Sequence, residues 1–182
     1  SIMQKAGCRV GLYTSPHLVD FTERIRINGR EIDESKIVEL TDRIRLKIQD
    51  SEFREELSKI TFFEFTTAIA LLYFAEEGVD IAVIETGMGG RLDATNVIKP
   101  LVSVITNISI EHKELLGDTI EAVAYEKAGI IKAGIPLVTG VEQPQAFQVI
   151  EKICSEKGAP LYRLGRDFSF QRNGTTKLSY NG

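Results

Sequence analysis

Ser15, Glu85 and His112 are the residues whose types and positions favour chemistry at one shared site. Each lies in a loop that follows an apolar run, and these runs predict strands at Arg9–Tyr13, Asp80–Ile84 and Leu101–Thr106. A hydroxyl, a carboxylate and an imidazole suit a divalent cation that keeps several waters for phosphate exchange. From spacing alone, His112 is more readily a capped loop residue than a metal ligand, and both interpretations stay open.

The loop from Glu85 to Asn96, ETGMGGRLDATN, places a carboxylate directly before a glycine-rich turn. A carboxylate at the mouth of a buried strand is costly to desolvate, so it needs a cation or an arginine as partner. A dinucleotide fingerprint is disfavoured because Leu92 stands where the third glycine belongs. The chain also contains no Walker loop. The sequence therefore predicts a site for a cation and an anion without the usual phosphate loop.

Strands alternate with helices along the chain, which predicts an α/β fold with a mostly parallel sheet and helices on both faces. One helix is expected after the N-cap Asp33, since apolar residues recur there at three- and four-residue steps, at Ile37, Leu40, Ile44 and Ile48. The other expected helices are Phe65–Glu77, Thr119–Lys132 and Gln145–Lys157. The expected strands add Phe21–Asn28, Ile135–Thr139 and Leu161–Leu164 to the three above. Ligands bind beyond the carboxyl ends of parallel strands, so the loops after them should share one edge.

Three local patterns refine these elements. Ile25 and Ile27 alternate with Arg24 and Arg26, which predicts a half-buried strand. Asp118, with Glu121 three residues on, resembles a capping box for the helix that follows. The segment 167–182 alternates around an Asn-Gly pair at residues 173 and 174, which predicts a small antiparallel hairpin near the C-terminal end.

Composition bounds the class of protein. The chain has 182 residues, 43% of them hydrophobic, which is enough for about one domain with an ordinary core. Its net charge is −4, and its basic residues are dispersed among acids, which argues against nucleic acid as the main partner. No signal peptide and no membrane-spanning run is present. Cys8 and Cys154 lie far apart and have no metal-ligand spacing, so we interpret them as reduced thiols and expect a cytoplasmic location, although their spacing alone also allows a disulfide.

Six motifs occur in order between Gly7 and Gly140. They are Tyr13–Leu18 (YTSPHL), Arg24–Gly29 (RIRING), Thr61–Phe65 (TFFEF), Glu85–Asn96, His112 with Leu116–Thr119 (LGDT), and Glu126–Lys132 (EKAGIIK). Together they resemble the folylpolyglutamate synthases, which are often bifunctional with dihydrofolate synthase and belong to the Mur ligases. What the resemblance covers is the central ATPase domain of that family.

The resemblance implies an ATP-dependent ligase that adds L-glutamate to folate or dihydropteroate through an acyl phosphate, with ATP and Mg²⁺ as cofactors. By matching motif, Ser15, Glu85 and His112 resemble magnesium ligands. Lys127 matches a lysine that is carbamylated in the family and helps to hold a second magnesium, so Glu85, His112 and Lys127 are the implied catalytic residues. The alternative for Lys127 is a solvated helix lysine, or one paired with Glu121 or Glu126.

Two further stretches resemble folate contacts. One is Thr61, Phe62, Phe63 and Glu64, and the other is Leu92, Asp93 and Ala94. The two phenylalanines offer flat apolar faces for a pterin, and the carboxylates of Glu64 and Asp93 can accept hydrogen bonds from pterin nitrogens. The alternative is that the rings belong to the core and that Glu64 caps the following helix.

The ends of the chain look like those of an excised piece, since the first residues read as the end of a helix stopped by Gly7. On the resemblance, the phosphate loop lies upstream and the glutamate-binding domain downstream. We expect residues 1–182 to form one ATP-binding domain that is inactive alone, from a monomeric parent whose partners are small molecules and not a membrane. The alternatives are another Mur-type amide ligase, such as one of peptidoglycan precursor assembly, and a non-catalytic domain that binds a nucleotide or a partner.

Overall fold

The computed structural model describes residues 2–52, 54–110, 112–173 and 177–181. The chain divides into two compact units, Ser1–Gly87 and Met88–Gly182, and each is described by itself. Among the described residues, no helix is long and apolar enough to cross a membrane.

The first unit is built on a four-stranded sheet with the order β3-β2-β1-β4. Its strands are β1 (Val10–Tyr13), β2 (Ile25–Ile27), β3 (Arg30–Glu31) and β4 (Ile81–Ile84). Strand β1 pairs in parallel with β4 and antiparallel with β2. The carboxyl ends of β1 and β4 therefore meet at one edge, with Tyr13 opposite Ile84.

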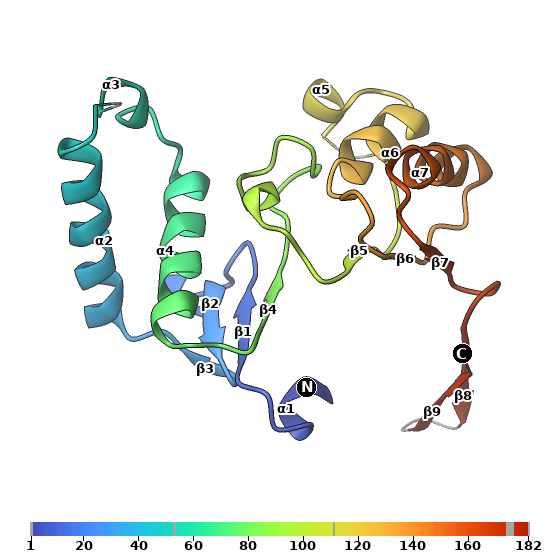
Figure 1. The fold of residues 1–182 in the computed structure, drawn as a ribbon, viewed down its shortest axis with the longest axis horizontal. Coiled ribbons are helices and arrows are strands. Elements are labelled where there is room, and N and C mark those ends of the chain that lie inside the picture. Colours follow the sequence, from blue (N-terminus) through green and yellow to red (C-terminus); the bar gives the residue numbers. More distant parts are fainter. Residues whose placement is uncertain (1, 53, 111, 174–176, 182) are drawn as a thin grey trace. The chain divides into compact units, whose positions relative to one another are not determined.

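The helical segments of this unit are α1 (Ile2–Lys5), the 3₁₀ turn η1 (Phe21–Arg24), α2 (Glu34–Gln49), α3 (Arg54–Leu57) and α4 (Phe62–Glu76). Helices α2 and α4 lie side by side (Figure 1). Helix α4 also packs directly on β1, because a Cβ at Gly11 would lie 2.9 Å from the Phe74 ring. Tyr13, Leu40 and Phe74 are buried in the core between these elements.

Two predicted boundaries in the first unit were wrong. The segment predicted as one strand, Phe21–Asn28, begins with the turn η1, because the Glu23 carboxylate accepts backbone hydrogen bonds from Leu18, Val19 and Asp20 and so closes a turn there. Helix α4 begins at Phe62, three residues before its predicted start. Thr61 and Glu64 form a capping box, which satisfies backbone N–H groups at that earlier position.

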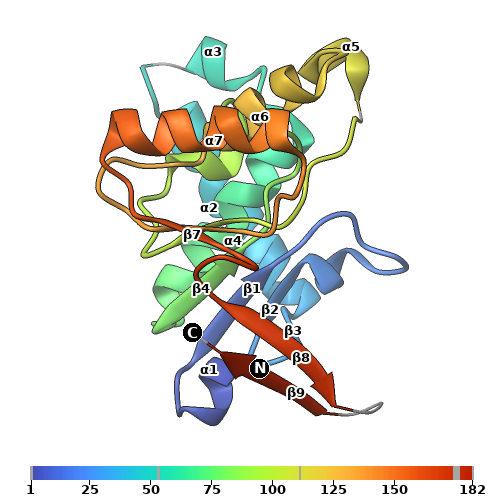
Figure 2. The same cartoon turned by 90° about the vertical axis from the view of Figure 1, so that its right-hand side faces the viewer.

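The second unit contains a parallel sheet with the order β5-β6-β7. Its strands are β5 (Ser103–Ile105), β6 (Leu137–Thr139) and β7 (Leu161–Arg163), followed by the antiparallel pair β8 (Ser169–Asn173) and β9 (Lys177–Asn181). Its helical segments are η2 (Ala94–Val97), α5 (Lys113–Leu116), α6 (Ile120–Ala128) and α7 (Pro144–Lys157). Helices α6 and α7 pack against each other (Figure 2). The predicted Asn-Gly turn includes Gly174, which lies outside the described residues.

The start and end of α6 also differ from the prediction. Thr119, and not Asp118, is the N-cap, since its Oγ1 accepts the N–H of Ala122 at 3.2 Å. The helix ends at Ala128, four residues before Lys132. The side chain that accepts an N–H group of the first turn defines the N-cap, and here that side chain belongs to Thr119.

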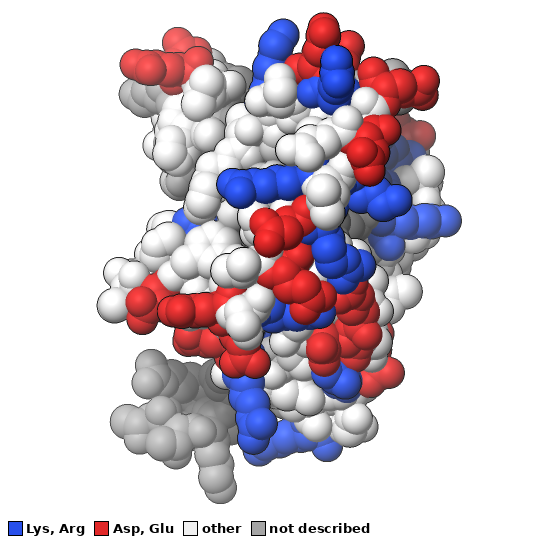
Figure 3. Space-filling model, turned by 90° about the vertical axis from the view of Figure 1, so that its left-hand side faces the viewer, with Lys and Arg blue, Asp and Glu red and all other residues white. Residues whose placement is uncertain are grey.

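The α/β class, the parallel strand pairs and the small antiparallel part near the C-terminal end are confirmed. On the face shown in Figure 3, basic and acidic side chains are intermixed and do not form a patch of one sign. Among the exposed ion pairs of the first unit, Lys36 and Arg43 of α2 both bridge Glu76 of α4. Exposed ion pairs of this kind contribute little to stability.

Candidate functional site

Ser15 and Glu85 lie together at the carboxyl edge of β1 and β4. The backbone N–H of Ser15 donates a 2.8 Å hydrogen bond to Oε2 of Glu85. The N–H of Glu85 donates to the carbonyl of Tyr13 at 3.0 Å, which continues the parallel pairing one residue beyond the strands. The predicted meeting of these two residues at one strand edge is thus confirmed within the first unit.

The Ser15–Glu85 pair leaves oxygen atoms available for a cation. Glu85 is exposed, and only its Oε2 accepts a hydrogen bond from a described residue. No described basic residue forms a salt bridge with it, and the Ser15 hydroxyl makes no hydrogen bond within the described part of the chain. A carboxylate oxygen and a hydroxyl are hard ligands of the type that Mg²⁺ accepts together with water. The residues present therefore fit a hydrated magnesium ion.

His112 and Lys127 belong to the second unit. His112 is exposed, has a positive φ of 49°, and its carbonyl accepts the N–H groups of Leu115 and Leu116 at the start of α5. Lys127 is half-buried in the last turn of α6. Because each unit is described by itself, the convergence of these two residues with Ser15 and Glu85 stays a prediction.

The described residues contain no metal site made of His, Cys, Asp and Glu side chains alone. No group of three such side chains there could hold a metal ion. The predicted set contains only two such residues, Glu85 and His112, so this finding leaves the prediction as it stands.

The glycine-rich loop packs closely on helix α6. A Cβ at Gly90 would lie 2.9 Å from the carbonyl oxygen of Lys127, and a Cβ at Gly129 would lie 2.3 Å from the Cα of Arg91. The N–H of Arg91 donates to the carbonyl of Glu126 at 2.8 Å, and its guanidinium forms a salt bridge with the Glu126 carboxylate at 3.0 Å. Gly90 and Gly129 thus allow the loop and the helix that carries Lys127 to touch.

Sequence reasoning placed Arg91 and Glu126 inside motifs but gave their pairing no role. Glu126 was considered only as an alternative partner of Lys127. The signal was present as a glycine in each of the two motifs, at positions 90 and 129, because glycines on two segments permit close backbone contact. Nothing in the sequence showed which two segments would meet.

The stretch from Thr61 to Glu64 has a structural role in the described unit. Oε2 of Glu64 accepts hydrogen bonds from the N–H and the hydroxyl of Thr61, each at 2.7 Å. Both bonds lower the pKa of Glu64, and the bond from the Thr61 hydroxyl has the larger effect. The alternative that Glu64 caps the helix is therefore confirmed, and its second oxygen is left for another donor.

The two phenylalanines of this stretch have different surroundings. Phe63 packs on Tyr13, with ring centroids 6.0 Å apart, and a Cβ at Gly87 would lie 2.5 Å from its ring. Phe62 is 63% exposed, and the guanidinium carbon of Arg24 lies 5.6 Å from its ring centroid. Phe63 is thus largely a core residue, whereas Phe62 offers its ring to a ligand.

Asp93 holds its own loop in the second unit. One carboxylate oxygen accepts the N–H of Thr95 and the other accepts the N–H of Met88, both at 2.9 Å. Its neighbour Leu92 is 80% exposed, and Ala94 is half-buried. The predicted contact of these three residues with folate stays a prediction.

Arg24 is a residue that the sequence did not single out. Its alternation with Ile25 placed it on the open side of a half-buried strand, but it precedes β2 and is only 8% exposed. Its Nε donates a 2.8 Å hydrogen bond to Nδ1 of His17. The turn η1 redirects this side chain, and periodicity could not reveal that.

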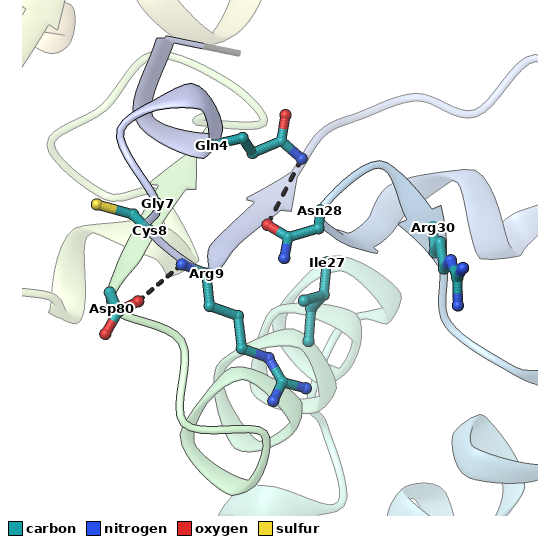
Figure 4. A pocket seen from close by; sticks show the side chains of 8 residues that line it. All are labelled: Gln4, Gly7, Cys8, Arg9, Ile27, Asn28, Arg30 and Asp80. Atoms are coloured by element: carbon teal, nitrogen blue, oxygen red, sulfur yellow. Dashed lines mark hydrogen bonds between the residues drawn. The ribbon is translucent and has the colours of Figure 1, made fainter.

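A separate pocket of about 760 Å³ opens at the amino-terminal ends of β1 and β4 (Figure 4). Its lining includes Arg9, whose N–H donates to Asp80 at 2.7 Å, and Asn28, whose amide oxygen lies 3.5 Å from Nε2 of Gln4. It lies at the opposite ends of the strands from Ser15 and Glu85, so it is not part of the candidate site.

Comparison with known proteins gives one family and a consistent set of relatives. The model of the Mur ligase middle domain matches residues 34–169. A dihydrofolate synthase/folylpolyglutamate synthase of Bacillus subtilis is 46% identical over 165 residues, which cover 90% of this chain and 38% of the relative.

Solved structures agree with this. The folylpolyglutamate synthase of Thermotoga maritima superposes with a TM-score of 0.90 at 42% identity, covering 100% of this chain and 42% of that one. A folylpolyglutamate synthase in complex with AMPPCP and folate gives a TM-score of 0.91 at 40% identity, covering 98% and 45%. The chain thus spans less than half the length of these relatives.

Proposed function

The chain belongs to the Mur ligase family through its middle domain, and from this premise we propose that the protein is an ATP-dependent ligase that adds L-glutamate to a folate. The acceptor class is tetrahydrofolate, with dihydropteroate as a second acceptor if the protein is also a dihydrofolate synthase. The chain is proposed to act as one ATP-binding domain in a monomeric, cytoplasmic enzyme, and the reduced state of Cys8 and Cys154 fits that location.

The proposed reaction has two steps. A carboxylate oxygen of the acceptor attacks the γ-phosphorus of ATP, the bond to the β-phosphate bridging oxygen breaks, and ADP leaves with its electron pair. The amine of L-glutamate then attacks the acyl carbon, loses a proton, and expels phosphate that carries one oxygen of the former carboxylate. Both steps concentrate negative charge, so the site must hold anions next to each other.

Ser15 and Glu85 are the residues of the first unit proposed to hold Mg²⁺, with His112 and a carbamylated Lys127 from the second. A bound magnesium supplies Lewis-acid stabilisation of charge on the phosphate oxygens. The unused oxygen of Glu85 and the unbonded hydroxyl of Ser15 support this proposal. Thr61, Phe62, Phe63 and Glu64, with Leu92, Asp93 and Ala94, are proposed to contribute to the folate site.

The single observation that carries the proposal is the Ser15–Glu85 hydrogen bond at the carboxyl edge of two parallel strands. It places a carboxylate with a free oxygen where α/β sheets bind their ligands. The relatives support the choice of reaction, since one solved relative is described as a complex with AMPPCP and folate.

The test uses the protein expressed from its complete gene. We expect it to incorporate glutamate into tetrahydrofolate with stoichiometric formation of ADP and phosphate, and to transfer ¹⁸O from a labelled acceptor carboxylate to that phosphate. Glu85→Gln should lower the rate about 100-fold or more. Glu34→Gln, which changes an exposed acid at the start of α2, is the matched control and should keep the rate.

Two results would contradict the proposal. Amide formation on a peptidoglycan precursor in place of folate would identify another Mur-type ligase. Nucleotide binding without any amide formation on either acceptor would identify a non-catalytic binding domain.

A further inference from the structure

Arg24 carries a buried charge without a carboxylate partner among the described residues. It is 8% exposed, and none of the salt bridges formed by described residues includes it. In that part of the chain, the bond from its Nε to Nδ1 of His17 is the one hydrogen bond of its side chain. Charged side chains this buried are normally paired, so we expect Arg24 to bind an anion that the described residues do not supply.

The rest of the guanidinium is open to a ligand. Within the described residues, the one fully buried side-chain nitrogen or oxygen that lacks a hydrogen bond is Nε of Arg26. The two terminal nitrogens of Arg24 donate no hydrogen bond within the described residues and are not in that group, so they reach solvent. They present N–H donors in a planar fork that matches the two oxygens of a carboxylate.

An aromatic surface lies next to this fork. The Phe62 ring is 5.6 Å from Cζ of Arg24 and packs edge-on against Phe21, with centroids 6.0 Å apart. Phe62 nevertheless remains 63% exposed. An anion held by Arg24 would thus have an apolar ring beside it, which favours an acid whose carboxylate is attached to an aromatic group.

Arg24 also fixes the loop that carries Ser15. Its carbonyl accepts the N–H of Thr14 at 3.0 Å, while its Nε holds His17 at the other end of the loop. Because arginine only donates, His17 must accept through Nδ1 and carry its proton on Nε2. His17 is therefore a positioning residue for the guanidinium, and Arg24 contacts the loop that carries Ser15 on both sides of that residue.

We infer that Arg24 binds the carboxylate of the acid that is to be activated, with the aromatic ring next to that carboxylate against Phe62. The inference rests on the proposed function and deepens it. In a pteroate-like acceptor the ring beside the carboxylate is the benzoyl ring, so Phe62 contacts that ring and not the pterin. L-glutamate and phosphate lack an aromatic ring, so the Phe62 ring would not favour their binding at Arg24.

The experiment compares an acid with its neutral analogue. The protein expressed from its complete gene, saturated with Mg²⁺ and AMPPCP, is titrated by calorimetry with pteroate and with pteroate carboxamide. Wild type should bind the acid about 10- to 100-fold more tightly than the amide, which is the range for hydrogen bonds to a charged group. In Arg24→Gln the preference should fall to within about twofold while the amide affinity is unchanged.

Three further variants make the result specific. Arg26→Gln is the matched control, because Arg26 bonds to Glu31 on the neighbouring strand, and it should keep the full preference. Arg24→Lys keeps the charge without the fork and should retain part of the preference, which also covers the case in which Arg24→Gln does not fold. His17→Phe keeps a ring but removes the acceptor of the Arg24 bond, and it should weaken the preference.

Several outcomes would overturn the inference. Wild type that binds acid and amide equally, or an Arg24→Gln protein that keeps the preference, would show that Arg24 does not bind the acceptor carboxylate. Displacement of pteroate from this site by L-glutamate or by phosphate would assign Arg24 to another anion. Wild type that binds neither pteroate nor its amide would contradict the proposed function itself.

Discussion

The backbone N–H of Ser15 and the carboxylate of Glu85 form a 2.8 Å hydrogen bond, although 70 positions separate the two residues along the chain. The bond uses the main chain of Ser15 and one carboxylate oxygen of Glu85. It therefore leaves the hydroxyl and the second carboxylate oxygen for other partners, and the loop geometry does not depend on the serine side chain.

This arrangement separates metal binding from folding at Ser15. Ser15→Ala keeps the backbone N–H, so the free energy of unfolding should change by less than about 0.5 kcal/mol. If the hydroxyl is a magnesium ligand, Mg²⁺ affinity should fall about 10-fold or more. Urea unfolding and Mn²⁺ titration followed by electron paramagnetic resonance measure the two effects. An unchanged metal affinity would remove Ser15 from the ligand set.

The capping box at the start of α4 predicts a cost to stability when Thr61 is truncated. Thr61→Ala removes the side chain that accepts the N–H of Glu64, and it should destabilise the protein by about 1 kcal/mol. Glu64→Gln should cost less, since an amide oxygen still accepts the Thr61 N–H. If the second oxygen of Glu64 contacts the pterin, Glu64→Gln should weaken folate binding more than Thr61→Ala does. The reverse order would leave Glu64 as a cap only.

The backbone hydrogen bonds accepted by the Glu23 carboxylate predict that the stability of the protein depends on pH in the acid range. Backbone hydrogen bonds from Asp20, Leu18 and Val19 lower its pKa from 4.5 to about 2. A lowered carboxyl pKa stabilises the folded state above the unfolded value, and that stabilisation is lost as pH falls towards the folded value. Wild type should thus exceed Glu23→Gln in stability at neutral pH, and the difference should shrink between pH 4.5 and about pH 2. Thermal unfolding across this range tests it, and a difference that stays constant with pH would contradict it.

Gly129 predicts a steric effect on the loop that faces Lys127. A Cβ at this position would lie 2.3 Å from both Cα and Cβ of Arg91, and backbone atoms cannot move aside at low cost. Gly129→Ala should destabilise the protein by about 1 to 3 kcal/mol. Ala133→Ser, an exposed change in the turn that follows, is the control and should have little effect. Equal stability of the two variants would show that the loop does not pack on α6 in this way.

The sequence by itself determined the elements with a strong local signal. The three- and four-residue spacing of apolar residues identified α2, the apolar run Arg9–Tyr13 identified β1, and runs rich in β-branched residues identified β4 and β5. It also placed Ser15 and Glu85 at the same edge, because the carboxyl ends of parallel strands meet there whatever the loops contain. These predictions needed only periodicity and the geometry of parallel pairing.

Only the tertiary structure decided which polar side chains are hydrogen-bonded within the protein and which remain available to a ligand. Glu64 and Asp93 were proposed as acceptors for a pterin, with a helix cap as the alternative for Glu64, and each accepts the N–H of a nearby residue, because local N–H groups compete for any carboxylate within reach. Arg24 was predicted on the open side of a strand, and it is buried against Phe62 because the turn η1 redirects it. Periodicity encodes the direction of a side chain only while the backbone stays regular, and functional loops are where that regularity ends.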